Sequence, residues 1–275
     1  MSFAPIGVFD SGYGGLTILS EIQRCLPQYD YIYLGDNARS PYGTRSFDVI
    51  NGFTKEAVEY LFAQGCPLII LACNTASAKA LRELQQHYLP YTDDPTRRIL
   101  GIIRPTVEAI SSFTRSNHVG VVATPGTVSS GSYTTEVGKL FPKVIVSEQA
   151  CPMWVPLVEY GESQSEGADY FVQKYIGQLM ARDEAIDTVL LACTHYPLLR
   201  DKIQAALPSG VSLISQGELV SASLEDYLMR HPEMACRLSQ GGAVSYRTTE
   251  CPEKFEELAS IFMGREVNAI RVKID

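Results

Sequence analysis

A short apolar stretch that ends in a cysteine occurs twice in this sequence, and this repeat limits the possible folds more than any other feature. Residues 71–78 read LACNTASA and residues 191–198 read LACTHYPL, so that Cys73 and Cys193 are 120 positions apart. Each cysteine ends a strand-like run and is followed by a helix-like stretch. The repeat therefore predicts two similar strand-to-helix units.

A second pair of segments lies at nearly the same offset. IGVFDSG at 6–12 resembles VGVVATPG at 119–126, and their glycines Gly7 and Gly120 are 113 positions apart. Two repeats at almost one offset predict two related α/β halves.

Apolar, β-branched runs alternate with helix-like stretches along the whole chain. This alternation is typical of an α/β fold with mainly parallel sheets. The expected strands are 5–9, 31–34, 68–72, 99–103, 119–123, 144–146, 188–192 and 211–214. The expected helices are about 15–25, 46–64, 76–88, 105–115, 127–140, 166–181, 197–206, 217–229 and 252–262.

Composition narrows the class of protein. With 275 residues, 45% of them hydrophobic and 20% charged, the chain fits one large globular domain or two of moderate size. Its net charge of −8 argues against a nucleic-acid partner, since such binders usually cluster Lys and Arg. The sequence has neither a signal-peptide pattern at its start nor an apolar run of about 20 residues. We therefore expect a cytoplasmic protein with no membrane partner.

The cysteines and histidines do not form a scaffold or a metal site. Seven scattered cysteines make an odd set without a CxxC pair, and the four histidines lack ligand spacing. DSGYGG at 10–15 follows a strand but lacks the GxGxxG spacing of a dinucleotide site. We expect no disulfide framework, no metal and no cofactor.

Polar residues gather where the expected strands end. Ligands of open α/β sheets bind beyond the carboxyl ends of the strands. The residues at these ends are Asp10, Ser11, Cys73, Asn74, Thr124, Cys193 and Thr194. Two halves that face each other would put one cysteine on each side of a shared cleft.

Two cysteines on opposite sides of such a cleft favour an enzyme that inverts a stereocentre. One group must take the α-proton from one face of the carbon, and another must deliver a proton to the opposite face. Near-attack distances of about 3 to 3.5 Å on each face put the two sulfurs roughly 6 to 7 Å apart. A helix N-terminus or an imidazolium favours the thiolate that serves as base.

Neighbouring groups fit the same chemistry. Backbone N–H groups that follow Cys73 and Cys193 can hold carboxylates, so an anionic substrate is expected. His195 can serve Cys193 as a relay or as a partner in its proton balance. Asp10 is the counterpart near Cys73, or it binds a substrate ammonium.

Other classes of protein remain open on the residues alone. A two-lobed solute-binding module would share the cleft without chemistry. Within the enzymes, an aspartate or hydantoin racemase or a related decarboxylase is an alternative. A redox protein is disfavoured because the chain lacks a CxxC pair.

Five motifs in order closely resemble the glutamate racemases of the aspartate/glutamate racemase superfamily. They are IGVFDSGYGGLT, YLGDNARSPYG, LACNTASA, CPMWVPLVEYG and LACTHYPLL, and the tail SYRTTECPEKFEELASIFMG is similar as well. The resemblance implies that Cys73 deprotonates the D-enantiomer and Cys193 the L-enantiomer. It also implies catalytic auxiliary roles for Asp10, Glu159 and His195. The substrate-binding set that it implies is Asp10, Ser11, Pro41, Tyr42, Gly43, Cys73, Asn74, Thr75, Thr124, Cys193, Thr194 and His195.

The resemblance further implies an architecture and a role. Two flavodoxin-like, doubly wound domains are expected, residues 1–98 plus 213–275 and residues 99–212, with the active site between them. L- and D-glutamate are the implied substrates, a homodimer the implied assembly, and D-glutamate for peptidoglycan the implied product. Activation by a cell-wall precursor is not expected, because the chain begins almost at its first strand.

Two positions depart from the pattern of the relatives. Ser215 stands where many have Asp, in a motif outside the catalytic set. Trp154 stands where smaller aromatic residues or Leu are common, and we expect it to change the shape of a neighbouring surface.

Overall fold

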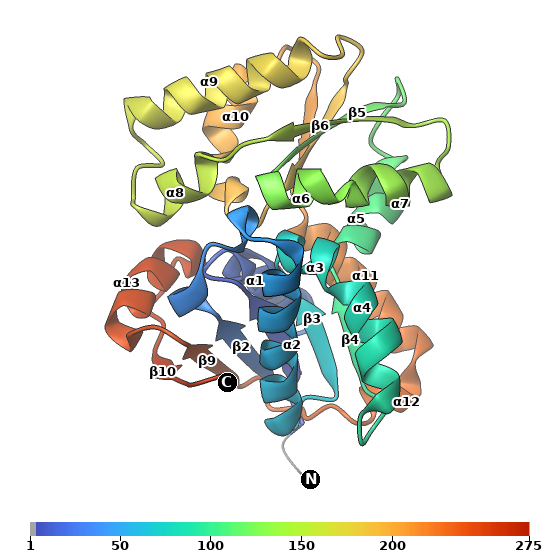
Figure 1. Ribbon diagram of the computed structural model, residues 1–275, viewed down its shortest axis with the longest axis vertical. Coiled ribbons are helices and arrows are strands. Elements are labelled where there is room, and N and C mark those ends of the chain that lie inside the picture. Colours follow the sequence, from blue (N-terminus) through green and yellow to red (C-terminus); the bar gives the residue numbers. More distant parts are fainter. Residues whose placement is uncertain (1–3, 275) are drawn as a thin grey trace.

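Two parallel sheets organise the chain into two lobes, one above the other in Figure 1. The computed structural model describes residues 4–274. Met1–Phe3, which begin the stretch considered for a targeting signal, and Asp275 lie outside the described residues. We call the lobe with the six-stranded sheet the first lobe and the other the second lobe.

The first lobe is built on a sheet with strand order β10-β9-β2-β1-β3-β4, in which all neighbours are parallel. Its central strands are fully buried runs such as LIIL, because helices cover both faces. The strands are β1 (Ile6–Asp10), β2 (Tyr31–Gly35), β3 (Leu68–Leu71), β4 (Arg98–Gly101), β9 (Val244–Thr248) and β10 (Ala269–Arg271).

Helices of the first lobe pack on the two faces of this sheet. The core on one face includes residues of α1, α11, α12 and α13, and the core on the other includes residues of α2 and α3. The helices are α1 (Gly15–Cys25), α2 (Phe47–Ala63), α3 (Asn74–Lys79), α4 (Leu81–Glu83), α11 (Gly217–Arg230), α12 (Pro232–Ala235) and α13 (Pro252–Met263).

The second lobe has a four-stranded sheet in the order β6-β5-β7-β8, again parallel. Its strands are β5 (His118–Ala123), β6 (Ile145–Ala150), β7 (Thr188–Ala192) and β8 (Ser212–Ile214). Its helices are α6 (Pro125–Ser130), α7 (Ser132–Leu140), α8 (Trp154–Glu159), α9 (Glu166–Met180) and α10 (Arg200–Ala206). Short turns of helix complete the chain: η1 (Asn37–Arg39), η2 (Tyr42–Thr44), η3 (Leu84–Tyr88), η4 (Leu89–Tyr91) and η5 (Tyr196–Leu199).

The two sheets share one local strand order. β2-β1-β3-β4 in the first lobe corresponds to β6-β5-β7-β8 in the second. Each order reverses beside its central strand, and doubly wound sheets bind ligands at this point. Asp10 ends β1 and Cys73 follows β3, while Thr124 follows β5 and Cys193 follows β7. The expected α/β class with mainly parallel sheets is therefore confirmed.

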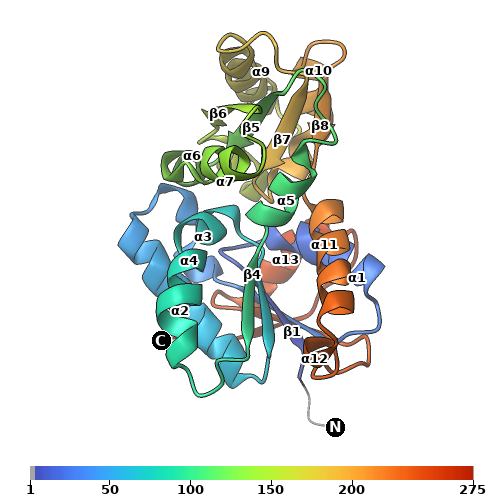
Figure 2. The same cartoon turned by 90° about the vertical axis from the view of Figure 1, so that its right-hand side faces the viewer.

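The chain crosses between the lobes twice. It leaves β4 through α5 (Ile103–Ile110) and returns from β8 directly into α11, and Figure 2 shows α5 and α11 on the same side of the junction. β4 pairs with β3 and β8 pairs with β7. An expected boundary after residue 98 separates β4 from its sheet, and one after residue 212 cuts through β8. The division into two domains remains a prediction, and its limits need to move to the crossings.

Several expected elements differ in their limits. The strand expected at 99–103 ends at Gly101, because Ile103, Val107 and Ile110 are buried at helical spacing in α5. The helix expected at 127–140 is divided at Gly131, whose φ of 59° is left-handed. The helix expected at 76–88 is divided between α3, α4 and η3, and the sequence analysis did not identify β9, β10 or α8.

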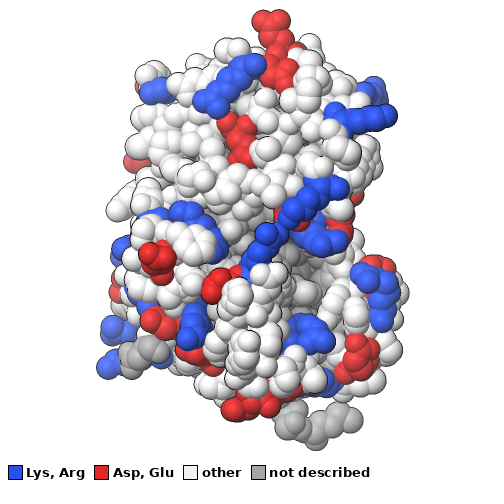
Figure 3. Space-filling model, turned by 45° about the vertical axis from the view of Figure 1, so that its right-hand side comes forward, with Lys and Arg blue, Asp and Glu red and all other residues white. Residues whose placement is uncertain are grey.

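The surface carries both signs of charge. On the face in Figure 3, the described Lys and Arg side chains lie interspersed with Asp and Glu. None of the helices within residues 4–274 has the length and apolar character needed to cross a membrane.

Candidate active site

One small cavity between the lobes is lined by both repeated cysteines. Cys73 follows β3 and precedes α3, Cys193 follows β7, and each residue is 6% exposed. The cavity has a volume of about 70 Å³. This volume is small against the roughly 300–1,000 Å³ of pockets that hold drug-sized ligands. The lobes are therefore drawn close together around the two thiols.

All twelve residues of the expected substrate-binding set line this cavity. They are Asp10, Ser11, Pro41, Tyr42, Gly43, Cys73, Asn74, Thr75, Thr124, Cys193, Thr194 and His195. Glu159 does not line it but lies behind His195. The structure thus brings the predicted residues together, while their roles remain predictions.

The sequence analysis missed part of the cavity wall. The additional lining residues are Ser40, Thr44, Pro125, Cys151, Pro152, Val155 and Pro156. Two of them, Cys151 and Pro152, lie between β6 and α8, and Val155 and Pro156 lie in α8 itself. Only the CPMWVPLVEYG motif pointed to this segment. Most are apolar, so their residue types carried no chemical signal.

The Cys73 thiol lies in a buried, anionic neighbourhood. Its Sγ accepts a hydrogen bond from the Ala76 N–H at 3.5 Å and lies 3.5 Å from the Ser11 hydroxyl. Burial, and then the nearby charge of Asp10, raise the pKa of Cys73 to about 12. At neutral pH this side chain is a thiol and can deliver a proton.

Asp10 has one oxygen that no described residue satisfies. Its Oδ2 accepts from the Gly12 N–H at 2.8 Å, whereas its buried Oδ1 has no hydrogen-bond partner among the described residues. Burial raises the pKa of this carboxyl, although the positive charge of His195 and the Gly12 amide oppose the shift. A buried acceptor without a partner is a place for a ligand donor.

The Cys193 thiol has a basic partner instead. Its Sγ lies 3.9 Å from Nδ1 of His195, whose Nε2 lies 3.0 Å from Oε1 of Glu159. Burial opposes a charge on His195, but its hydrogen bonds to Cys193 and Glu159 outweigh burial and raise its pKa to about 10. The imidazole is therefore protonated at neutral pH and places a positive charge next to Cys193.

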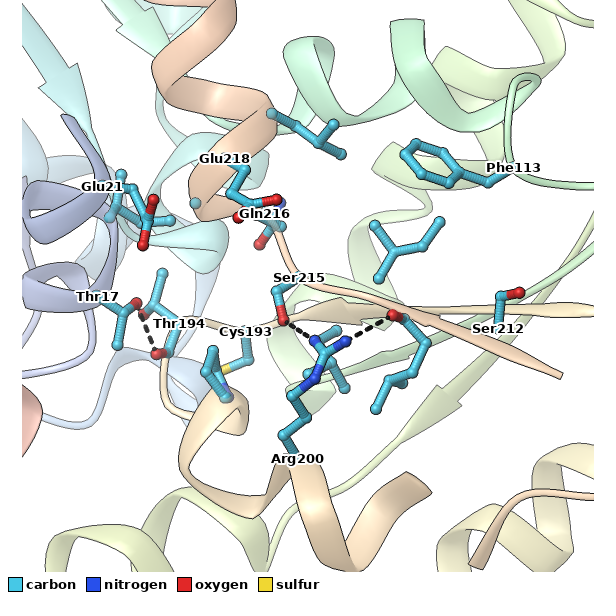
Figure 4. Close-up of a pocket in the computed structure, with 17 residues that line it drawn as sticks. Thr17, Glu21, Phe113, Cys193, Thr194, Arg200, Ser212, Ser215, Gln216 and Glu218 are labelled. Carbon is cyan, nitrogen blue, oxygen red and sulfur yellow. Dashed lines mark hydrogen bonds between the residues drawn. The ribbon is translucent and has the colours of Figure 1, made fainter. Parts of the chain in front are cut away.

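Close contacts join the lobes on two sides of the cavity. On one side, Thr75 Oγ1 lies 3.0 Å from Thr124 Oγ1, and a Cβ on Gly43 would lie 2.9 Å from Thr124 Cβ. On the other, Thr17 Oγ1 donates to the Thr194 carbonyl at 3.1 Å, as Figure 4 shows. Residues far apart in sequence thus form both rims of the site.

Tyr42 lines the cavity, but its hydroxyl is bonded elsewhere. The side chain is buried, and its OH donates to Oδ2 of Asp36 at 2.5 Å, which Arg39 also contacts. The hydroxyl is thereby occupied away from the thiols. Pro41 and Gly43, on either side, also line the cavity.

Trp154 does not shape a surface, so that expectation is wrong. It is fully buried, and its ring lies edge-on against Tyr196, with ring centroids 4.8 Å apart. The Tyr196 hydroxyl donates to the Cys151 carbonyl at 3.3 Å. Trp154 therefore supports the turn that follows Cys193, because Tyr196 begins η5 in that turn.

A second, larger cavity of about 420 Å³ lies behind Cys193, between α1, α10 and the start of α11 (Figure 4). Ser215 lies here, where its hydroxyl accepts from Nη1 of Arg200 at 2.8 Å. Cys193 and Thr194 line both cavities.

Neither a disulfide nor a metal cluster is present among residues 4–274. All seven cysteines are free, and no three His, Cys, Asp or Glu side chains within this range are grouped to hold a metal ion. Cys73 and Cys193 are thus available for proton transfer.

Two α/β lobes with cysteines from both in a shared cleft are the arrangement expected of a racemase, and known proteins of similar sequence identify the family. Residues 6–221 match the Asp/Glu/Hydantoin racemase family. The chain therefore belongs to the Asp/Glu/hydantoin racemase family and is an isomerase of amino acids. This finding confirms the expected resemblance.

Within this family, glutamate racemases match nearly the whole chain. The glutamate racemase of Jannaschia sp. (strain CCS1) is 39% identical over 272 residues, which cover 95% of this chain and 97% of the relative. The crystal structure of a glutamate racemase isoform from Bacillus anthracis has a TM-score of 0.88 at 33% identity and covers 98% of both chains. The glutamate racemase of Francisella tularensis, in complex with D-glutamate, has a TM-score of 0.87 at 31% identity over 99% of this chain and 98% of its own.

Proposed function

We propose that this chain interconverts L-glutamate and D-glutamate by a two-base proton transfer between the substrate and the cysteines Cys73 and Cys193. The observation that carries the proposal is that Cys73 from the first lobe and Cys193 from the second, the two repeated cysteines, line one cavity. Inversion at the α-carbon needs an acid on one face and a base on the other, and a planar intermediate lies between them. Two lobes that face each other supply the two sides.

The two directions of the reaction need opposite charge states of the two cysteines. Cys73 holds its proton, because its pKa is about 12, while the protonated His195 lies beside Cys193. L-glutamate then gives its α-proton to Cys193, and Cys73 delivers a proton to the opposite face. D-glutamate requires the reverse state, in which Cys73 is the thiolate. His195 and Glu159 stabilise the charge that moves on and off Cys193.

Polar groups of the cavity match the three charges of glutamate. The unpartnered Oδ1 of Asp10 is placed to accept from the substrate ammonium. Among the described residues that line the cavity there is no Lys or Arg, so hydroxyl and N–H groups hold the carboxylates. The proposed substrate-binding residues beside Asp10 and the cysteines are Ser11, Pro41, Tyr42, Gly43, Asn74, Thr75, Thr124 and Thr194, among which Pro41 has no donor and can contribute shape only.

Glutamate as the substrate is supported by the relatives. Those that match over nearly the full length are glutamate racemases, and the one from Francisella tularensis binds D-glutamate in its crystal structure. We further propose that the enzyme works without a cofactor as a homodimer in the cytoplasm. D-glutamate for peptidoglycan is its proposed product.

The test is circular dichroism of L-glutamate incubated with the purified enzyme in the absence of any added cofactor. The signal should decay to zero, and D-glutamate should give the mirror-image decay to the same end point. Parallel incubations with L-aspartate and with a hydantoin separate the alternative substrates. An unchanged glutamate signal at high enzyme concentration rules the proposed function out, and dialysis against a chelator tests for a hidden metal.

A further inference from the structure

A closed ring of hydrogen bonds includes the side chain of Gln216, at the point where β8 passes into α11 (Figure 4). Asn74 Nδ2 donates to Gln216 Oε1 at 2.6 Å, and Gln216 Nε2 donates to the Tyr133 hydroxyl at 2.8 Å. The Tyr133 hydroxyl donates to Asn74 Oδ1 at 2.7 Å and closes the ring. All three side chains are buried.

The directions of these bonds are fixed by chemistry. Each member donates once and accepts once within the ring, so turning over one amide alone would bring like groups together. Turning over both would point Gln216 Oε1 at Thr106 Oγ1, which already donates to the Ile102 carbonyl and needs a donor in return. The second hydrogen of Gln216 Nε2 goes to Thr106 Oγ1 at 2.9 Å. Only a side chain with one acceptor and two donors at this reach satisfies all of these partners, and a buried group that loses its partner is destabilised.

The ring and its outside partner Thr106 come from both lobes and from both crossings between them. Asn74 belongs to α3 in the first lobe and Tyr133 to α7 in the second. Thr106 lies on α5, and Gln216 lies at the start of α11, so these two residues represent the two crossings. The ring is therefore complete only when both lobes and both crossings are in register.

Asn74 connects this ring to the cavity. It follows Cys73 directly and lines the cavity, whereas Gln216 does not line it. The ring uses one of the two hydrogens on Asn74 Nδ2, and among the described residues no protein acceptor takes the other. That hydrogen is left for a ligand, and its position depends on Gln216.

We infer that Gln216 is a positioning residue for the reaction, which fixes the Asn74 amide beside Cys73 when the lobes are together. The inference rests on the proposed racemisation. Gln216 itself touches no reacting atom. Its loss lets Asn74 turn and loosens the turn that carries Cys73, while the unit that carries Cys193 keeps its own contacts.

An irreversible half-reaction separates this role from a general structural one. With a 3-chloroglutamate, one thiolate takes the α-proton and the C–Cl bond breaks. Chloride leaves, and the resulting enamine is hydrolysed by water to 2-oxoglutarate and ammonium. By the proposed roles, Cys73 serves the D-compound and Cys193 the L-compound. Racemisation cannot make this distinction, because the equilibrium between mirror-image substrates ties the kcat/KM values of the two directions together.

The experiment compares Gln216→Met, which keeps the length but removes the polar groups, with Gln216→Glu, which keeps the shape but loses both donors. Both variants should lower kcat/KM for racemisation roughly 10- to 100-fold, as expected when buried groups lose their partners. Elimination from the D-compound should fall about tenfold more than elimination from the L-compound. Tyr133→Phe removes the other bond to Asn74 and should reproduce this bias, while Ser215→Ala, one residue away, should stay near the parent rate.

The outcomes are separable. Equal losses of D- and L-elimination, or a parent-like kcat/KM in Gln216→Met, overturn the inference. Failure of the parent enzyme to racemise glutamate overturns the proposed function instead. If Gln216→Met does not fold, Gln216→Glu and Tyr133→Phe decide the question by the same ratio of eliminations.

Discussion

The sulfur of Cys193 lies 3.9 Å from the imidazole Nδ1 of His195. Cys73, in the repeated position of the other lobe, has the Ser11 hydroxyl and the Asp10 carboxyl as its neighbours. The two halves therefore repeat the placement of a thiol but not its electrostatic surroundings. Substitutions around each cysteine should consequently affect one half-reaction more than the other.

Replacement of either cysteine by serine should stop racemisation, because a hydroxyl is a far weaker base than a thiolate. With Cys73→Ser, the enzyme should still eliminate chloride from the L-form of 3-chloroglutamate through Cys193. Cys193→Ser should retain only the D-elimination. The measurement is 2-oxoglutarate release for each enantiomer, with optical rotation of glutamate as the racemisation assay.

Folding is the control for both variants, since the exchange of sulfur for oxygen is nearly isosteric, and their unfolding temperatures should match the parent. Equal loss of both eliminations in both variants contradicts the two-base assignment. So does racemisation at the parent rate by either variant.

Glu159→Gln should weaken the Cys193 side of the reaction. It removes the carboxylate that lies 3.0 Å from His195 Nε2 and that helps to keep the imidazole charged. Racemisation should fall by roughly two orders of magnitude, the size of an acid–base contribution. L-elimination should fall more than D-elimination. The exposed Glu162 nearby offers a matched control, and Glu162→Gln should leave both eliminations unchanged.

The stability of the folded enzyme should decrease as the pH rises from neutral to about 10. The pKa of His195 is raised in the folded state from 6.5 to about 10, so its contribution is full below pH 6.5 and is lost as the pH rises through 10. The pKa of Cys73 is raised from 9.0 to about 12, so its contribution is lost only above pH 9. Unfolding temperatures measured by calorimetry across this range should show the decrease.

Two variants separate the contributions of His195 and Cys73 to this pH dependence of stability. His195→Gln should flatten the curve between pH 7 and 9, and Cys73→Ser should leave that window as it is in the parent enzyme. A parent-like slope in His195→Gln would show that His195 is not the group responsible.

Gly14→Ala should damage the contact between the lobes. A Cβ at Gly14 would lie 2.3 Å from Thr194 Oγ1 and 2.5 Å from His195 Nδ1, so the turn after Cys193 must shift. We expect destabilisation of about 1–3 kcal/mol from overpacking and a loss of activity of at least about tenfold. Denaturant unfolding and the racemisation assay provide the two measurements.

Gly52→Ala is the matched control for this substitution. Gly52 lies within α2, and a Cβ there would meet nothing within 4 Å. Alanine should stabilise the enzyme by about 0.5–1 kcal/mol, because glycine is the poorer helix former. Similar effects at Gly14 and Gly52 would contradict the role of close packing at Gly14.

The sequence predicted the parts of the site that depend on strand ends. Asp10, Cys73 and Cys193 could be placed in one cleft because each lies at or just after the carboxyl end of a buried strand. The residue types there are also the types that move protons. Local pattern and chemistry thus pointed to the same positions.

Parts that depend on how the lobes dock were not predictable from local pattern. Gln216 reads as the residue before a helix, and its partners Asn74 and Tyr133 lie 142 and 83 positions away. Val155 is an apolar residue whose place in the cavity follows from docking alone. The lobe to which β4 belongs was not predicted for the same reason. Its pairing with β3 places it in the first lobe, and this pairing cannot be read from local pattern.

The two crossings between the lobes lie side by side, because Gln216 bonds to Thr106. A body that is joined to its neighbour along one edge moves most easily by swinging about that edge. For such a swing, substrate entry, product release and the exchange of thiol hydrogens with water would all share one opening. In heavy water, a glutamate molecule inverted during one closed interval would carry the hydrogen that the delivering cysteine took up while the cleft was last open.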